Sequence, residues 1–201
     1  MLILVGKSPT SLKRTIGEYH DHLGILASPR KPMFAESASR EGLPWAADND
    51  CYNGDLDAPA YRKMLWKAVH AKGCLFVCAP DVVGDREATL RRWDDWYWRI
   101  AEYGYPVGFV TQDGMTVEDI PWIQADAIFI GGTDSWKLSQ PSREIADECR
   151  RLEKWLHMGR VNTPRRMETA IEWNVDSVDG TGTSILTSQV LPWQLEMASQ
   201  S

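Results

Sequence analysis

Short apolar runs alternate along the chain with stretches in which apolar residues recur at helical spacing. The runs predict eight strands: Leu2–Val5, Gly24–Ala27, Trp45–Ala47, Cys74–Ala79, Val107–Thr111, Ala127–Ile130, Leu156–Gly159 and Ser177–Val178. The run Cys74–Ala79 is apolar at every position, as expected for a strand of a parallel sheet that is buried on both faces.

Between these runs, apolar side chains fall on single helix faces. One stripe comprises Tyr61, Met64, Leu65, Ala68 and Val69, and a second comprises Leu90, Trp93, Tyr97 and Ile100. Further helices are predicted after the first strand, around Ile145 and Cys149, from Pro164, and over Leu191–Met197. The segment Ser28–Pro44 carries three prolines and is predicted to be a long loop with at most one helical turn.

Regular alternation of strands and helices predicts a parallel α/β fold. Eight such units in 201 residues indicate one domain, residues 1–201, folded as a compact (β/α)8 barrel at the small end of its size range. A doubly wound open sheet is the alternative.

Composition places few further limits on function. With 43% hydrophobic and 25% charged residues the chain is of ordinary globular type. No apolar run is long enough to span a membrane, which points to a cytoplasmic protein. The net charge of −6 argues against a general nucleic-acid binder unless positive charge is concentrated locally. The four cysteines lack zinc-ligand spacing and are predicted to be buried thiols.

In a barrel the residues that follow each strand face the active site. Carboxylates stand at three of these positions, Asp48, Asp81 and Asp179. Paired carboxylates suit attack at an anomeric carbon, with one as the nucleophile and the other handling the proton. Basic side chains at other strand ends, Lys137, Arg160, Arg165 and Arg166, are candidates for holding phosphates. Plain turns and helix caps are the simpler explanation of each position taken alone.

Several common catalytic motifs are missing from the sequence. No dinucleotide fingerprint, phosphate-binding P-loop or G-x-S-x-G elbow is present, and no two histidines have metal-ligand spacing. His157 lies within a predicted strand near the site, and no catalytic role is assigned to it.

The strand ends, taken in order, resemble motifs of the tRNA-guanine transglycosylase family, especially its short phage members, the DNA-deazaguanine transglycosylases. The similarity runs from about Trp45 to Gly182. The matching segments are Asp48-Asn49-Asp50-Cys51-Tyr52-Asn53, Ala79-Pro80-Asp81, Val110-Thr111-Gln112-Asp113-Gly114, Ile130-Gly131-Gly132, His157 to Pro164, and Asp176-Ser177-Val178-Asp179. In the first segment Asp50 and Cys51 replace two glycines of the family motif, and this departure puts the local backbone in question.

The resemblance implies a (β/α)8 barrel that exchanges guanine for a 7-deazaguanine through a covalent glycosyl-enzyme intermediate. It assigns the nucleophile to Asp179 and the general acid/base to Asp48. Base contacts fall on Asp81, Gln112, Gly131, Gly132 and Met158, with Met158 and a Tyr or Trp sandwiching the ring. Lys137, Arg160, Arg165 and Arg166 would hold flanking phosphates.

The expected partners are DNA, or alternatively tRNA, together with guanine and a preQ0-like base. A homodimer or a partner protein is also compatible with the resemblance. The family's zinc-binding Cys/His cluster has no counterpart after Asp179, so neither a metal nor a cofactor is predicted. In a phage-encoded protein the compartment would be the host cytoplasm. The alternatives are an N-glycosidase that uses water, a non-catalytic nucleic-acid-binding subunit, and an unrelated phosphosugar barrel enzyme.

Overall fold

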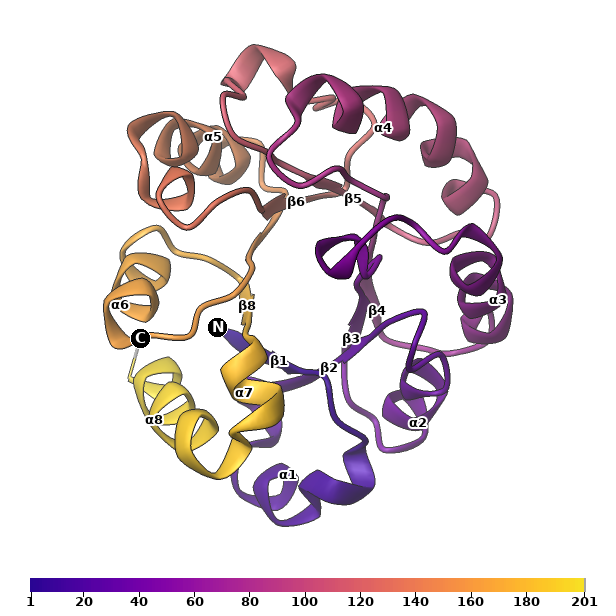
Figure 1. Cartoon of the computed structure of the whole chain (residues 1–201). Helices are drawn as coiled ribbons and strands as arrows, with labels where there is room; N and C mark the ends of the chain where they lie inside the picture. Colours follow the sequence, from indigo (N-terminus) through magenta and orange to yellow (C-terminus); the bar gives the residue numbers. More distant parts are fainter. Residues whose placement is uncertain (201) are drawn as a thin grey trace.

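The computed structural model describes residues 1–200, except the side chain of Asn53, and forms a closed barrel of eight parallel strands (Figure 1). Each strand pairs with the next in the chain, and β1 also pairs with β8, which closes the ring. The strands are β1 Leu2–Val5, β2 Leu23–Ala27, β3 Trp45–Ala47, β4 Cys74–Cys78, β5 Val107–Val110, β6 Ala127–Ile130, β7 Trp155–Met158 and β8 Ser177–Asp179. The prediction of a compact (β/α)8 barrel is confirmed, and the open doubly wound sheet is excluded.

Helices surround the ring of strands in Figure 1. They are α1 Lys13–Tyr19, α2 Phe34–Arg40, α3 Ala58–Ala68, α4 Arg86–Ala101, α5 Gln140–Arg151, α6 Pro164–Glu172, α7 Thr181–Ile185 and α8 Thr187–Ser199. Four of them begin at side-chain caps, Asp57, Asp85, Ser139 and Thr163. Each cap accepts a hydrogen bond from a backbone N–H of the first turn, which would otherwise lack a partner.

Three connections differ from the sequence prediction. The predicted loop Ser28–Pro44 contains α2, whose buried residues Ala35 and Ala38 are too small to give a strong apolar stripe. Where a short helix is predicted around Thr116–Trp122, β5 and β6 are joined within the described residues through only a 3₁₀ helix, η4 Val117–Asp119. After β8 the chain forms the short helix α7, which lies beside β1 and next to α8 in Figure 1.

Alternation along the strands separates two apolar cores. Side chains such as Leu4, Phe76 and Val110 fill the barrel interior. The neighbouring positions on the same strands point outward and pack, together with residues such as Ile145, between barrel and helices. Because the strand period is two, Asp179 points into the barrel, whereas Val178 belongs to the outer core. No helix in residues 1–200 is long and apolar enough to cross a lipid bilayer.

Candidate functional site

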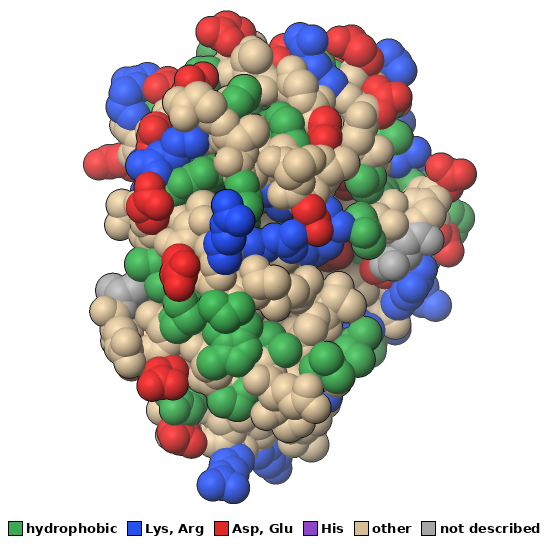
Figure 2. All heavy atoms as spheres, turned by 60° about the vertical axis from the view of Figure 1, so that its left-hand side comes forward, with side chains coloured by type: hydrophobic (Ala, Val, Ile, Leu, Met, Phe, Trp, Pro, Cys, Tyr) green, Lys and Arg blue, Asp and Glu red, His purple; other side chains and the backbone are tan. Residues whose placement is uncertain are grey.

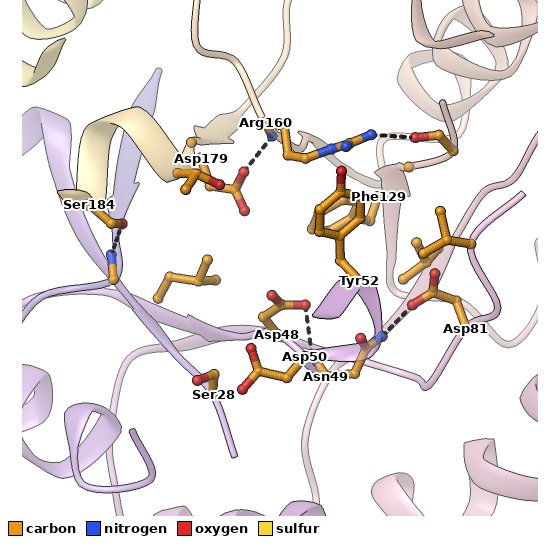
Figure 3. Close-up of a pocket in the computed structure, with 18 of the residues that line it drawn as sticks. Ser28, Asp48, Asn49, Asp50, Tyr52, Asp81, Phe129, Arg160, Asp179 and Ser184 are labelled. Carbon is orange, nitrogen blue, oxygen red and sulfur yellow. Dashed lines mark hydrogen bonds between the residues drawn. The ribbon is translucent and has the colours of Figure 1, made fainter. Parts of the chain in front are cut away.

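A cavity of about 430 Å³ opens at the carboxyl ends of the strands. Its volume lies within the usual range for small-molecule sites, roughly 300–1,000 Å³. Figure 3 shows Asp48, Asp179 and Tyr52 projecting into it from different parts of the barrel wall. The barrel therefore places its cavity where barrel enzymes bind their substrates.

Asp179 is the last residue of β8 and is only 8% exposed. Its Oδ1 accepts a hydrogen bond of 2.6 Å from the backbone N–H of Arg160. Burial opposes ionisation of this carboxyl, but contacts with His157 and Arg160 and the charge of Lys137 outweigh it and lower its pKa. Asp179 is thus held as a carboxylate inside the cavity.

Asp48 follows β3 directly and is half-buried in the same cavity. Burial raises its pKa to about 7, and the negative charges of Asp179, Asp50 and Asp81 add to the effect. One backbone hydrogen bond, from the N–H of Asn49 to Oδ1 at 2.8 Å, acts in the opposite direction. Asp48 can therefore take up or release a proton near neutral pH.

Asp50 lies in the turn after β3, at the position where the resembled motif has a glycine. Asp50 has φ 62° and ψ 11°, the left-handed conformation that glycine adopts most easily and that aspartate tolerates better than most residues. Its carboxylate lies 3.6 Å from Nε of Arg30. Asp50 thus holds a backbone conformation that glycine would also adopt.

Asp81 and Gln112 lie together in a buried polar cluster at one side of the cavity. The Asp81 carboxylate accepts hydrogen bonds of 2.7 Å from Nε2 of Gln112 and from Nδ2 of Asn49. Oε1 of Gln112 accepts from the backbone N–H of Gly84 at 2.9 Å. Burial raises the pKa of Asp81, although these hydrogen bonds oppose the shift. The cluster presents an acceptor-rich wall whose orientation is fixed.

Gly131 and Gly132 follow β6, and both line the cavity. A Cβ on Gly131 would lie 2.6 Å from the carbonyl oxygen of Thr111, which is backbone and cannot swing away. Gly132 has φ +70°, and a Cβ there would lie 2.6 Å from Oδ2 of Asp113. The two glycines thus keep backbone close to the cavity where any side chain would be excluded.

We expect Gly131→Ala to lower the free energy of unfolding by about 1–3 kcal/mol, the usual effect of overpacking. Gly17→Ala is the matched control, because a Cβ on this exposed glycine of α1 meets nothing within 4 Å. That control should gain about 0.5–1 kcal/mol, since alanine favours a helix over glycine. Urea unfolding of both variants measures the difference. Equal stabilities would show that the tight contact at Gly131 is absent in solution.

The four predicted basic residues occupy different environments. Lys137 and Arg160 line the cavity, whereas Arg165 is exposed on α6 and Arg166 forms an ion pair of 2.6 Å with Asp134. Nζ of Lys137 is buried and donates to the carbonyl of Gly159 at 2.9 Å. Burial lowers the pKa of this amine to about 8, and the charge of Arg160 adds to the effect.

Arg160 has φ +57°, an uncommon conformation for a residue other than glycine. This backbone directs its N–H at Asp179, while Nη2 donates to the carbonyl of Gly132 at 2.7 Å. Its guanidinium also lies 4.2 Å from the ring centre of Tyr52. Arg160 therefore links the carboxylate, the glycine pair and the aromatic wall.

The prediction that Met158 contacts a bound base is wrong. Met158 is fully buried in the outer core and does not line the cavity. It pairs with Val178 in the sheet, and both side chains point away from the barrel interior. His157, one position earlier, points inward instead. Strand alternation could have predicted this orientation: Asp179 points into the barrel, so Val178 and its register partner Met158 must point outward.

Two aromatic side chains that were not singled out in the sequence do line the cavity. Tyr52, 58% exposed, stands at the mouth in the 3₁₀ helix η3 Cys51–Asn53, and Phe129 rises from β6 (Figure 3). In the resembled segment that begins at Asp48, the aromatic position falls on Tyr52, so the sequence could have indicated this residue. Phe129 is indicated only by strand alternation, because it shares a face with Gly131.

Basic side chains form a band across the face of the molecule shown in Figure 2, and a hydrophobic patch lies directly below it. The exposed apolar residues Ile185 and Leu186 lie at the end of α7. Positive charge is thus concentrated locally although the net charge is −6. Among the described residues, no group of three or more His, Cys, Asp or Glu side chains is arranged to hold a metal ion.

The chain matches no protein-family model and no curated protein at a significant level. Its backbone is similar to deoxyribose phosphate aldolase from Aeropyrum pernix, with 13% identity, a TM-score of 0.58, and coverage of 90% of this chain and 84% of the aldolase. For 3-hexulose-6-phosphate synthase from Salmonella typhimurium the identity is 14% and the TM-score is 0.53, and the match covers 100% of this chain and 97% of the synthase. Phosphoribosyl anthranilate isomerase from Thermus thermophilus is 14% identical, with a TM-score of 0.51, and the match covers 100% of this chain and 99% of the isomerase.

These three neighbours are barrel enzymes, and at such low identity the similarity establishes the fold alone. The chemistry of this chain has to be inferred from its own site.

Proposed function

We propose that this protein is a glycosyltransferase that exchanges guanine in a nucleic acid for a 7-deazaguanine. The observation that carries the proposal is a pair of carboxyl groups in one cavity whose pKa values are shifted in opposite directions. Asp179 is held ionised, whereas the pKa of Asp48 is raised to about 7. Environments that separate two carboxyl groups in this way suit a nucleophile and a general acid/base.

In the first half-reaction, an oxygen of Asp179 attacks the anomeric carbon of the target nucleotide. The bond to N9 of guanine breaks with its electron pair passing to N9, and Asp48 supplies the proton that N9 takes up. The nucleotide is then covalently attached to Asp179. In the second half-reaction, Asp48 removes a proton from the 7-deazaguanine, whose nitrogen attacks the same carbon and releases Asp179.

The buried cluster of Asp81, Gln112 and Asn49 supports recognition of a purine-like base. A carboxylate aligned by two amides accepts hydrogen bonds from the N–H edge of guanine, and a 7-deazaguanine carries the same edge. The exposed ring of Tyr52, backed by the Arg160 guanidinium, offers a stacking surface in place of Met158. Gly131 and Gly132 leave room for backbone groups to contact the base.

A base can reach this cavity only after leaving the stack, at a cost of a few kcal/mol in a duplex. Arg30 and Lys31 line the cavity together with Arg160 and Lys137, and these cations favour a phosphate backbone. We propose DNA as the polymer because the motifs are most like those of the short phage enzymes, and tRNA as the alternative.

The experiment that tests the proposal is a base-exchange assay. The protein is incubated with labelled guanine and, separately, with labelled 7-deazaguanines, each against DNA and tRNA, and label in the polymer is followed. We expect incorporation into DNA. Incorporation into tRNA alone would change the polymer but keep the chemistry. Release of guanine without incorporation would indicate an N-glycosidase. The absence of both reactions would leave a binding subunit or an enzyme that needs a partner.

Lys137 favours a second candidate function, imine chemistry on a carbonyl substrate. A buried amine with a pKa of about 8 is deprotonated more readily than an ordinary lysine and can act as a nucleophile. Borohydride reduction in the presence of sugar phosphates would trap such an imine as a stable mass increase, and Lys137→Met would remove it. We rank this function second because Nζ already donates a hydrogen bond to the backbone carbonyl of Gly159.

A further inference from the structure

His157 is a buried histidine for which the exchange reaction has no assigned role. It points from β7 into the barrel interior and is 0% exposed. Its imidazole lies between two aromatic rings, with centroid distances of 4.4 Å to Phe129 and 5.3 Å to Phe76. A polar ring in such apolar surroundings is costly unless its nitrogens have partners.

A hydrogen-bond chain fixes which nitrogen of His157 carries the proton. Nε1 of Trp155 donates to Oγ of Ser177 at 2.9 Å, because an indole N–H can only donate. Oγ of Ser177 also lies 2.8 Å from Nδ1 of His157. The buried hydroxyl hydrogen of Ser177 has its available acceptor in Nδ1, so Ser177 donates to His157. The neutral imidazole must then carry its hydrogen on Nε2.

This Nε2–H faces Asp179. The distance from Nε2 to Oδ2 of Asp179 is 3.8 Å, longer than a hydrogen bond, and Nε2 has no other partner among the described residues. Hydrogen bonds at active sites are often long before substrate binds and shorten in the complex. A buried donor with a single carboxylate before it is arranged to interact with that carboxylate.

We propose that His157 is a positioning residue for Asp179: the Trp155–Ser177–His157 chain directs one N–H at Oδ2 while Arg160 directs another at Oδ1. The role in exchange rests on the proposed function. The two donors fix the plane of the carboxylate and favour its charged form. They also stabilise the negative charge that returns to Asp179 when the incoming base releases it, because that charge develops beside donors already in place.

The serine in this chain is not a nucleophile. Ser177, His157 and Asp179 resemble a Ser-His-Asp triad, but Ser177 is 0% exposed and its hydroxyl is held by Trp155. The member that reaches the cavity is the aspartate. The same residue types therefore work in the opposite direction, with the serine orienting the histidine and the histidine orienting the carboxylate.

Other titratable groups act on Asp179 and have to be separated from His157. Lys137 from the 3₁₀ helix η5 Trp136–Leu138 and the backbone N–H of Arg160 favour the ionised form. Asp48 after β3 and Cys78 on β4 are the acidic groups that interact with it. A test must change His157 and leave these groups in place.

His157→Leu removes the donor and suits the apolar surroundings, whereas His157→Gln keeps an N–H that can reach Asp179. The readout is the titration of the Asp179 carboxyl by carbon NMR in the free protein, which requires no substrate. In His157→Leu we expect the midpoint to rise by about one pH unit and the rate of exchange to fall by about tenfold. His157→Gln should recover most of both changes. Thermal unfolding should show that His157→Leu still folds but with a lowered midpoint, because the buried Ser177 hydroxyl loses its acceptor Nδ1.

An unchanged Asp179 titration in His157→Leu would overturn the inference whether or not exchange is observed. Nitrogen NMR of the wild-type imidazole offers a second decision, since a proton on Nδ1 rather than Nε2 would also overturn it. A shifted titration in a protein that performs no exchange would support the coupling and count against the proposed function. The two ideas can therefore fail separately.

Discussion

Replacing Asp179 by asparagine is expected to abolish the covalent adduct and to slow base exchange by at least about 10³-fold. The amide is nearly the same size as the carboxylate and can still accept the N–H of Arg160 through its oxygen. It lacks the charge and nucleophilicity needed to attack an anomeric carbon. Denaturing electrophoresis of protein incubated with labelled DNA, without an acceptor base, measures the adduct.

Asp147→Asn is the matched control for this change. Asp147 is exposed on α5, outside the cavity, and forms an ion pair of 2.9 Å with Arg143. Such pairs contribute little to stability, so this variant should retain both adduct and exchange. An adduct that still forms with Asp179→Asn would assign the nucleophile to another residue.

Most of the barrel could be predicted because each strand is a short apolar run and most are separated by a helical stripe. The eight observed strands lie at the predicted positions to within a residue or two. The sequence failed to reveal α2 because Ala35 and Ala38 bury little apolar surface and prolines stand on both sides. The short helix α7 also lacked a signal, since only Thr183 of its five residues is buried.

The site was predicted less completely than the fold because strand-end position does not say which way a side chain points. Asp48, Asp81, Gln112 and Asp179 do line one cavity. Met158 faces the opposite side of its strand and does not line the cavity. This error concerns orientation, which depends on strand alternation.

Long-range pairing sets a second limit on what the sequence can predict. The Trp155–Ser177–His157 chain joins β7 to β8 through side chains 22 and 20 residues apart. No local pattern predicts such a contact. The left-handed backbone at Asp50 and at Arg160 is likewise invisible in the sequence, because neither residue is a glycine. The electrostatics of Asp179 depend on one of these conformations and hence on the completed fold.

Asp48 is expected to give the two half-reactions opposite pH dependences, with a midpoint for adduct formation near its pKa of about 7. Departure of guanine requires protonated Asp48, so adduct formation should be fast below pH 7 and should fall as the pH rises. Attack by the 7-deazaguanine requires ionised Asp48, so discharge of the adduct should accelerate as the pH rises. The midpoint for discharge should lie lower, because esterified Asp179 no longer carries the negative charge that raises the pKa of Asp48. Single-turnover measurements of each half-reaction between about pH 5 and 8.5 provide the test.

Asp48→Asn should slow exchange by about 10²–10⁴-fold and remove both pH dependences.

The same variant should be more stable than the wild type at pH 8. Folding raises the pKa of Asp48 from 3.8 to about 7, so the folded state binds the proton more tightly than the unfolded state. The wild type therefore loses stability as the pH rises from about 4 to 7, by roughly 1.4 kcal/mol for each unit of pKa.

Below pH 4 the carboxyl is protonated in both states, and the stability advantage of Asp48→Asn should disappear. Urea unfolding of both proteins at pH 4 and pH 8 measures the difference in their free energies of unfolding at each pH. Asp147→Asn is the control, whose difference from the wild type should not change between pH 4 and pH 8. If Asp48 had no role in the reaction, Asp48→Asn would gain stability at pH 8 and keep the wild-type rate of exchange. A gain in stability at pH 8 together with a loss of exchange would instead show that the buried Asp48 carboxylate destabilises the fold but is needed for the reaction.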